Sequence, residues 1–168
     1  MTSELTKLRN LARGIMDFAS RFVDERGPDR LPPTWHIEAL GEVFVIATPF
    51  SGPEDKDAVA AYIRGFLKMS GAERYAFVSE SWTRQPLPSE RPETLEGNVC
   101  DHPDRREVIH VHAEDAERVV TMECAILRTE HGEKRWRVME PKEISAHEKT
   151  DFDRQLNARF SNLIVRRP

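Results

Sequence analysis

The most constraining feature of the sequence is a segment over residues 72–82 that is apolar on both faces of a strand. Side chains alternate across a β-strand, so Tyr75 and Phe77 would lie on one face and Ala76 and Val78 on the other. Strands with this pattern are usually covered on both sides and lie inside a sheet. The segment therefore predicts a central strand.

Two segments carry apolar residues at helical spacing. Over residues 3–25 they recur at steps of three and four, which predicts an amphipathic helix that is broken at Gly27. A second helix is expected to begin at a capping box, in which Ser51 and Glu54 satisfy backbone N–H groups, and to end at Gly71.

The remaining strands are predicted from β-branched and alternating residues. Residues 34–39 and 43–48 indicate a β-hairpin, and residues 106–113, 118–129 and 134–140 indicate three more strands. The connections between these last three are of hairpin length, so we expect an antiparallel meander.

A second capping-box pattern, from Ser145 to Glu148, predicts a C-terminal helix with the apolar residues Phe152, Leu156, Phe160 and Leu163. The resulting order is helix, two strands, helix, four strands, helix. It predicts an α+β fold with a mostly antiparallel sheet of about six strands and three helices. The length of 168 residues suits one domain over residues 1–168. Within it, residues 83–104 contain four prolines and form a long loop that we expect to be mobile or functional.

Composition excludes several classes of protein. The chain has 25 Lys and Arg against 29 Asp and Glu, and a net charge of −4 argues against nucleic acid as a partner. No apolar run approaches the roughly 18 residues of a membrane span, and the N-terminus lacks the pattern of a secretory signal. Only two cysteines, Cys100 and Cys124, are present, which fits a reducing compartment. We therefore expect a soluble cytoplasmic protein.

The sharpest candidate for chemistry is a pair of histidines on one strand. His110, His112 and Glu114 would share a face, and two imidazoles about 6–7 Å apart can converge on one metal ion, with the carboxylate as a third ligand. The simpler interpretation is that this face is the wetter side of an antiparallel sheet. We favour it because His-x-His has no second ligand pair at a defined spacing here.

Cys100 and His102 are weaker metal candidates. Both residue types bind zinc, and a thiol beside a histidine can be an activated nucleophile. No second Cys-x-x-Cys or His-x-x-x-His pair accompanies them, so Cys100 is better explained as an ordinary loop residue. Cys124 follows the alternation of a core thiol.

Glu80 lies at the end of the predicted central strand and is a candidate catalytic residue. A parallel arrangement with the histidine strand would bring Glu80 beside His112, whereas an antiparallel one would place it near Arg106. A salt bridge explains Glu80 at least as well as catalysis.

Several short runs together resemble a family of small uncharacterised proteins from bacteria and their phages. The likeness covers residues 35–128 and is carried by the runs 47–50, 54–57, 74–82, 106–108 and 113–115, of which Ser79-Glu80-Ser81-Trp82 is the most distinctive. The resemblance implies no activity, because none is assigned to the family.

Two hypotheses on function follow. The favoured one is a non-enzymatic module that binds a protein partner or itself, because nucleotide-binding, hydrolase and zinc-protease motifs are absent from the sequence. The alternative is a metal-dependent hydrolase that uses His110 and His112, with Glu114 or Glu80. No cofactor is predicted under the first hypothesis, and a divalent metal such as zinc is expected only under the second.

Overall fold

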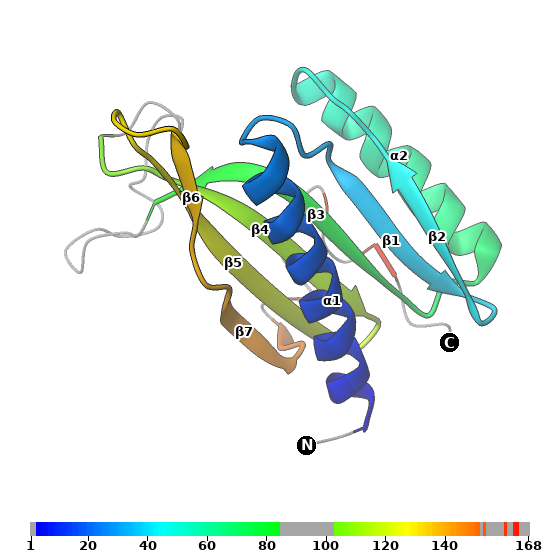
Figure 1. The fold of residues 1–168 in the computed structure, drawn as a ribbon. Coiled ribbons are helices and arrows are strands. Elements are labelled where there is room, and N and C mark those ends of the chain that lie inside the picture. The colour runs from blue at the N-terminus through cyan, green and yellow to red at the C-terminus, as the bar shows by residue number, and fades with distance from the viewer. Residues whose placement is uncertain (1–2, 85–102, 152, 154–159, 161–162, 165–168) are drawn as a thin grey trace.

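A computed structural model describes residues 3–84, 103–151, 153, 160 and 163–164 and confirms the α+β class (Figure 1). This part of the chain holds two helices and a seven-stranded antiparallel sheet. The elements are α1 (Ser3–Arg26), β1 (Thr34–Ala39), β2 (Glu42–Ala47), α2 (Pro53–Ser70), β3 (Arg74–Thr83), β4 (Arg106–Asp115), β5 (Arg118–Arg128), β6 (Trp136–Val138) and β7 (Lys142–Glu148). The strand order is β2-β1-β3-β4-β5-β6, and β7 also pairs with β5.

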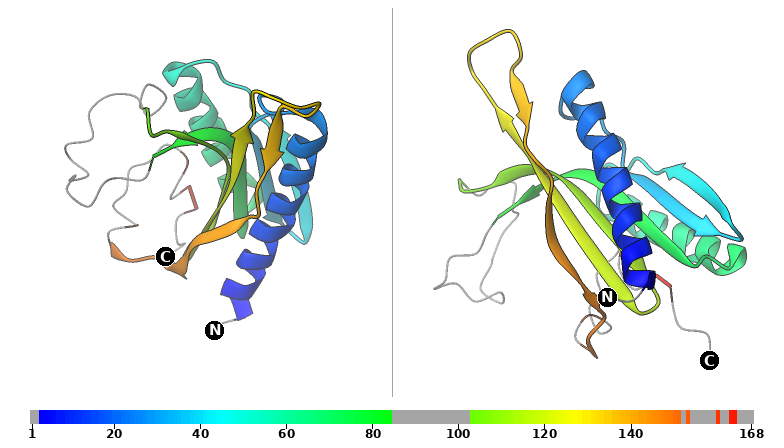
Figure 2. Two further views of the ribbon diagram at one scale, coloured as in Figure 1. Left: turned by 60° about the vertical axis from the view of Figure 1, so that its left-hand side comes forward. Right: turned by 60° about the horizontal axis from the view of Figure 1, so that its bottom comes forward.

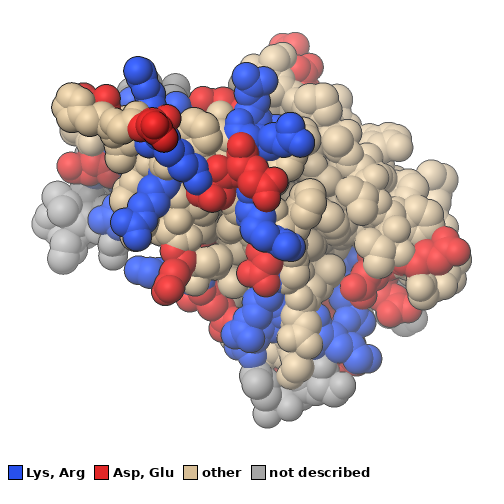
Figure 3. Space-filling view, viewed as in Figure 1, with Lys and Arg blue, Asp and Glu red and all other residues tan. Residues whose placement is uncertain are grey.

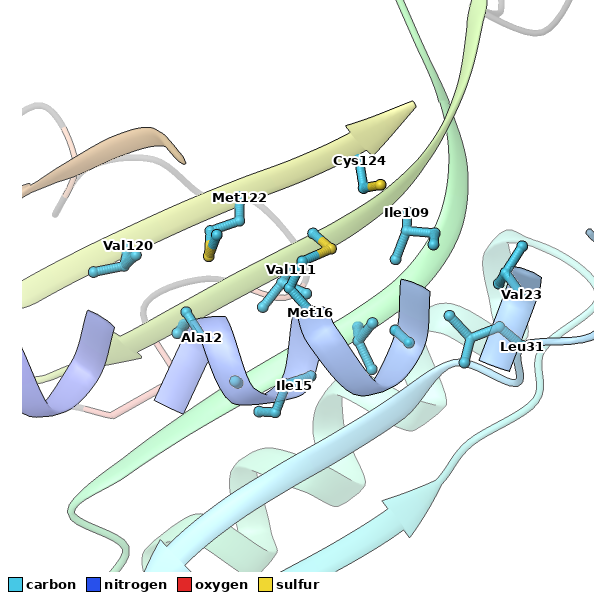
Figure 4. Packing of buried hydrophobic residues seen from close by; sticks show 14 of the residues in the cluster. Ala12, Ile15, Met16, Val23, Leu31, Ile109, Val111, Val120, Met122 and Cys124 are labelled. Carbon is cyan, nitrogen blue, oxygen red and sulfur yellow. The ribbon is translucent and has the colours of Figure 1, made fainter. Parts of the chain in front are cut away.

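Helix α1 covers one face of the sheet, over β3, β4 and β5 (Figure 4). Its apolar stripe follows the spacing of three and four residues and packs against the strand residues that alternate toward it. Met16 of α1, Val111 of β4 and Met122 of β5 lie in this buried cluster. The amphipathic helix predicted over residues 3–25 is therefore confirmed, and it packs on the domain's own sheet.

Helix α2 lies on the other face, over β2, β1 and β3. Its Ile63 and Leu67 are buried in a cluster with Trp35 of β1 and with Tyr75 and Phe77 of β3. Because the two helices cover opposite faces and both lie over β3, this strand is covered on both sides, as its two apolar faces predict (Figure 2).

The hairpin of β1 and β2 forms the margin of the sheet. Leu40 and Gly41 connect the two strands with φ angles of 55° and 78°. Two successive residues with positive φ are typical of the tight hairpin turns that match the twist of the strands. The paired register runs without interruption from Ala39 opposite Glu42 to Thr34 opposite Ala47.

The predicted start of α2 is wrong in one detail and its end is right. The N-cap is Gly52, which offers no side chain. Ser51 instead bonds to Asp55, whose Oδ2 accepts the Ser51 N–H at 3.0 Å and the hydroxyl at 2.6 Å. Gly71 ends the helix with a φ of 65°, a left-handed conformation that glycine adopts without strain.

The predicted start of the C-terminal helix at Ser145 is wrong. Ser145 to Glu148 belong to β7, which pairs with residues 118–123 of β5. The short β6 pairs only with residues 126–128 of β5, so the rest of that edge was left for another strand to complete. Backbone pairing along a whole strand outweighs a local capping pattern, because each paired residue satisfies its N–H and C=O groups. Of the apolar residues expected in this helix, Phe152 and Leu156 lie outside the described residues.

Of two other expectations, one is confirmed and the other falls mostly on residues that are not described. The three-stranded meander is confirmed as β4, β5 and β6. Most of the predicted loop over residues 83–104 lies outside the described residues, because these end at 84 and resume at 103. Neither described helix combines the length and the apolar character that crossing a membrane requires.

Candidate functional site

The histidine strand is β4, an interior strand between β3 and β5. Ile109, Val111 and Ala113 point toward α1 and are fully buried. His110 and His112 lie on the opposite face and are partly exposed. The alternation of β4 thus divides its apolar and polar residues between the two faces as the sequence predicts.

Glu114 is the centre of a buried polar cluster on that second face. Its carboxylate lies 3.0 Å from Nε2 of His112 and 3.3 Å from Nζ of Lys149, and it accepts the N–H of Leu163 at 3.1 Å. Burial alone raises the pKa of Glu114, but the contacts with His112 and Lys149 outweigh it and hold the pKa of this carboxyl below its ordinary value. Glu114 therefore joins β4 to the residues that follow β7.

Tyr75 completes this cluster from β3, where it lies opposite Glu114 in the register. Its hydroxyl donates a hydrogen bond to the carbonyl of Phe160 at 3.0 Å. Burial, reinforced by the neighbouring Glu114 carboxylate, raises the pKa of Tyr75 well above its ordinary value. The phenol is therefore a hydrogen-bond donor in the folded protein.

The two histidines are each paired with a carboxylate on their own face. His112 contacts Glu114, and Nδ1 of His110 lies 3.5 Å from Glu123 of β5. An imidazole held by a carboxylate is an arrangement that general bases use, so the His112–Glu114 contact is the part of this face suited to proton transfer. Among the described residues, no group of three metal-ligand side chains includes either histidine.

Glu80 lies on the other face of the sheet from the histidines. Strands β3 and β4 are antiparallel, and Glu80 is opposite Ile109. Its carboxylate accepts the backbone N–H groups of Asp29 at 2.5 Å, Arg30 at 3.2 Å and Leu31 at 2.8 Å. Glu80 therefore fixes the turn that connects α1 to β1, and the parallel arrangement with His112 is wrong.

Glu80, Asp29 and Glu107 form the single group of three candidate metal ligands within the described ranges, with ligand atoms within 4.8 Å of one another. Arg128 already neutralises two of them, because its guanidinium bonds to Glu107 at 2.7 Å and to Asp29 at 2.8 Å. These bonds raise the pKa of Arg128. Glu80 in turn is engaged by backbone N–H groups, so the cluster is an ion-pair network that joins the turn after α1 to β4 and β5.

Of the two cysteines, the structure describes Cys124, which the sequence predicts to be a core thiol, and not the candidate Cys100. Cys124 is buried against α1, as expected for a core thiol, and its Sγ donates to the carbonyl of Met139 at 2.8 Å. Burial raises the pKa of this thiol, which disfavours the reactive thiolate. Cys100 and His102 both lie outside the described residues.

A candidate binding feature that the sequence did not predict is the edge strand β2. Its residues Val43 and Val45 are 58% and 60% exposed, while Phe44 and Ile46 on the other face pack against the α2 side. A strand that is apolar on both faces is typical of a sheet interior, yet β2 is at the margin. The sequence shows the two apolar faces of this strand, whereas only the strand order shows that it lies at an edge.

Comparison with known proteins gives no family. No family profile matches the sequence, and no curated protein or solved structure matches it either. This agrees with the expectation of a family without an assigned activity.

Proposed function

We propose that this protein is a non-enzymatic binding module that recognises an extended protein strand at the edge of β2. The observation that carries the proposal is that β2 is the terminal strand of the sheet and is apolar on both faces. An added strand would complete the sheet by main-chain hydrogen bonds and would cover the exposed side chains.

The backbone of β2 offers hydrogen-bonding groups on its outer side. Thr48 donates its N–H to the carbonyl of Pro33 at 2.8 Å, so residue 48 points toward β1. In an antiparallel ladder this direction alternates, which directs the groups of Phe44 and Ile46 toward β1 and those of Val43 and Val45 outward. Within the described part of the chain, β1 is the only strand that pairs with β2.

The side chains of this edge favour an apolar partner. Over β1 and β2 the surface in Figure 3 is largely free of charged side chains except near the tip of the hairpin, whereas Lys, Arg, Asp and Glu gather over α1, β5 and β6. Natural edge strands are usually protected by lysine, proline or a bulge. β2 has none of these and carries a single charge, Glu42.

A strand peptide tests this function directly. We expect a fluorescein-labelled peptide of alternating valine and threonine to bind, as measured by anisotropy, and its counterpart with N-methyl groups along both edges to fail. Val45→Pro removes the outward N–H without touching the β1 ladder, so it should weaken binding about tenfold. Val45→Thr keeps the N–H and should bind normally. Equal binding of the methylated peptide would exclude strand addition.

The competing proposal is a metal-dependent hydrolase at His110 and His112, and metal analysis separates the two. Under the strand-binding proposal, the purified protein should hold no stoichiometric zinc, since among the described residues neither histidine belongs to a group of three metal-ligand side chains. Stoichiometric zinc that is lost when both histidines are replaced by alanine would instead favour the hydrolase.

A further inference from the structure

Resting on this strand-binding function, we propose that the strand bound at β2 is β2 of a second copy of the chain. The two copies would pair antiparallel across a two-fold axis that passes midway between their Val45 residues. The two sheets would then form one continuous sheet, with α1 and its symmetry mate on the same face. The argument uses the direction of the backbone groups, the side chains of β2 and one flank of α2.

The outward groups of β2 are symmetric about Val45. Alternation directs the N–H and C=O groups of Val43, Val45 and Ala47 away from β1. A two-fold axis at Val45 pairs this residue with itself and pairs Val43 with Ala47 of the second copy. Three N–H groups from each copy then find a carbonyl, so all the outward groups of the strand are satisfied.

Neighbouring registers satisfy fewer of these groups. An axis at Phe44 would place Ala47 opposite Gly41, which belongs to the hairpin turn of the other copy. An axis at Ile46 would place Val43 opposite Pro49, which has no N–H to donate. The register centred on Val45 is the one in which the three outward residues pair with one another.

Side chains and charges suit this register. Residues opposite each other in an antiparallel pair lie on the same face, so the exposed Val43 and Val45 of one copy would contact their equivalents or Ala47 in the other. Glu42 would lie opposite the uncharged Thr48, which avoids placing like charges together. Leu40, which is 84% exposed at the hairpin tip, would lie beside the segment that contains Phe50 of the second copy.

One flank of α2 favours a second copy over an unrelated strand. Phe66 contacts Phe44 of β2, with ring centroids 5.5 Å apart, so this flank of the helix lies on the β2 side. Tyr62 and Met69 lie four residues before and three after Phe66, hence on the same flank, and they are 59% and 83% exposed. In the joined sheet the two α2 helices would lie beside each other and cover these side chains, which a bare strand would leave in water.

Amide exchange measured by NMR at rising protein concentration tests this dimer residue by residue. Protection of the Val43, Val45 and Ala47 amides should rise with the dimer fraction measured by sedimentation. Phe44 and Ile46, whose N–H groups face β1, should keep constant protection and serve as internal references. A protein that stays monomeric up to about 1 mM, with rapidly exchanging edge amides, would overturn the inference.

Variants show whether association uses this surface. Val45→Pro removes two hydrogen bonds per dimer and should weaken dimerisation about tenfold to a hundredfold. Met69→Lys should weaken it about tenfold, because the α2 flank would no longer be covered favourably. The matched control is Ile144→Lys on β7, which is 56% exposed and should leave the dimer unchanged. A dimer that is insensitive to both Val45→Pro and Met69→Lys contradicts the inference.

The strand-binding function and the second copy can fail separately. A strict monomer that still binds the strand peptide, and not its methylated form, would retain the function and exclude the second copy. A monomer that binds neither would exclude both. Concentration-dependent protection confined to the outward amides would support both.

Discussion

Replacing Glu114 by alanine is expected to lower the free energy of unfolding by about 3–5 kcal/mol, because it leaves the ammonium of Lys149 buried without a counter-charge. Both side chains are at most 2% exposed, and they lie 3.3 Å apart. The same change removes the acceptor for the Leu163 N–H. Chemical denaturation monitored by circular dichroism measures the loss, which is large against the 5–15 kcal/mol typical of a domain.

Glu123→Ala provides the matched control, since Glu123 lies on the same face of the sheet, pairs with His110 and is 25% exposed. We expect Glu123→Ala to lower the free energy of unfolding by no more than about 1 kcal/mol. Glu114→Ala with an equally small cost would show that the buried cluster is not stabilising.

The pH dependence of the free energy of unfolding tests the same contact, because protonation of Glu114 removes its charge. The folded-state pKa of Glu114 is lowered, so its contribution is complete above the unfolded-state pKa and is lost as the pH falls through the folded-state value. Wild type should therefore lose stability from about pH 5 downward more steeply than Glu114→Gln, which cannot titrate there. Parallel curves for the two proteins would contradict the lowered pKa.

Trp35→Ala is expected to lower the free energy of unfolding by a similar amount, about 3–5 kcal/mol, because it opens a cavity among packed rings. Trp35 is fully buried, and its ring centroid lies 4.5 Å from that of Phe77 and 5.3 Å from that of Phe160. Its indole N–H also donates to Oγ1 of Thr48 at 2.8 Å, just after β2. Denaturant titration gives the loss, and near-ultraviolet circular dichroism should lose much of its aromatic signal.

Trp82→Ala is the matched control, because it removes an indole that is not buried. Trp82 is 41% exposed and stacks with the guanidinium of Arg105 at 4.8 Å. We expect its replacement to lower the free energy of unfolding by about 1 kcal/mol or less. Equal losses at the two positions would mean that the cluster around Trp35 is loosely packed.

Most of the fold follows from local patterns in the sequence. The helical spacing over residues 3–25 predicts α1, and the two apolar faces of residues 72–82 predict an interior β3. Gly71 predicts the end of α2 because only a residue tolerant of positive φ ends the helix there easily. These features depend on residues that are near one another in the chain, so the sequence displays them directly.

The candidate site was predictable only in part. Alternation along β4 correctly puts His110, His112 and Glu114 on one face, because it is a property of a single strand. The partners of that face come from distant segments, and Lys149 follows β7, where the capping pattern from Ser145 to Glu148 predicts a helix instead. Glu80 likewise accepts backbone N–H groups from the turn after α1, in which Arg30 is 50 residues away in the chain.

Apart from residues 142–148, the sequence by itself determined which of the described residues form helices and strands, which of their faces are apolar, and that the class is α+β, because spacing and turn residues act over a few positions. Only the tertiary structure decided the order of the strands, and with it that β2 is an edge and that β7 completes β5. The physical reason is that backbone hydrogen bonds between strands are nearly independent of sequence. Which strands become neighbours is therefore settled by how the helices and the long-range contacts pack.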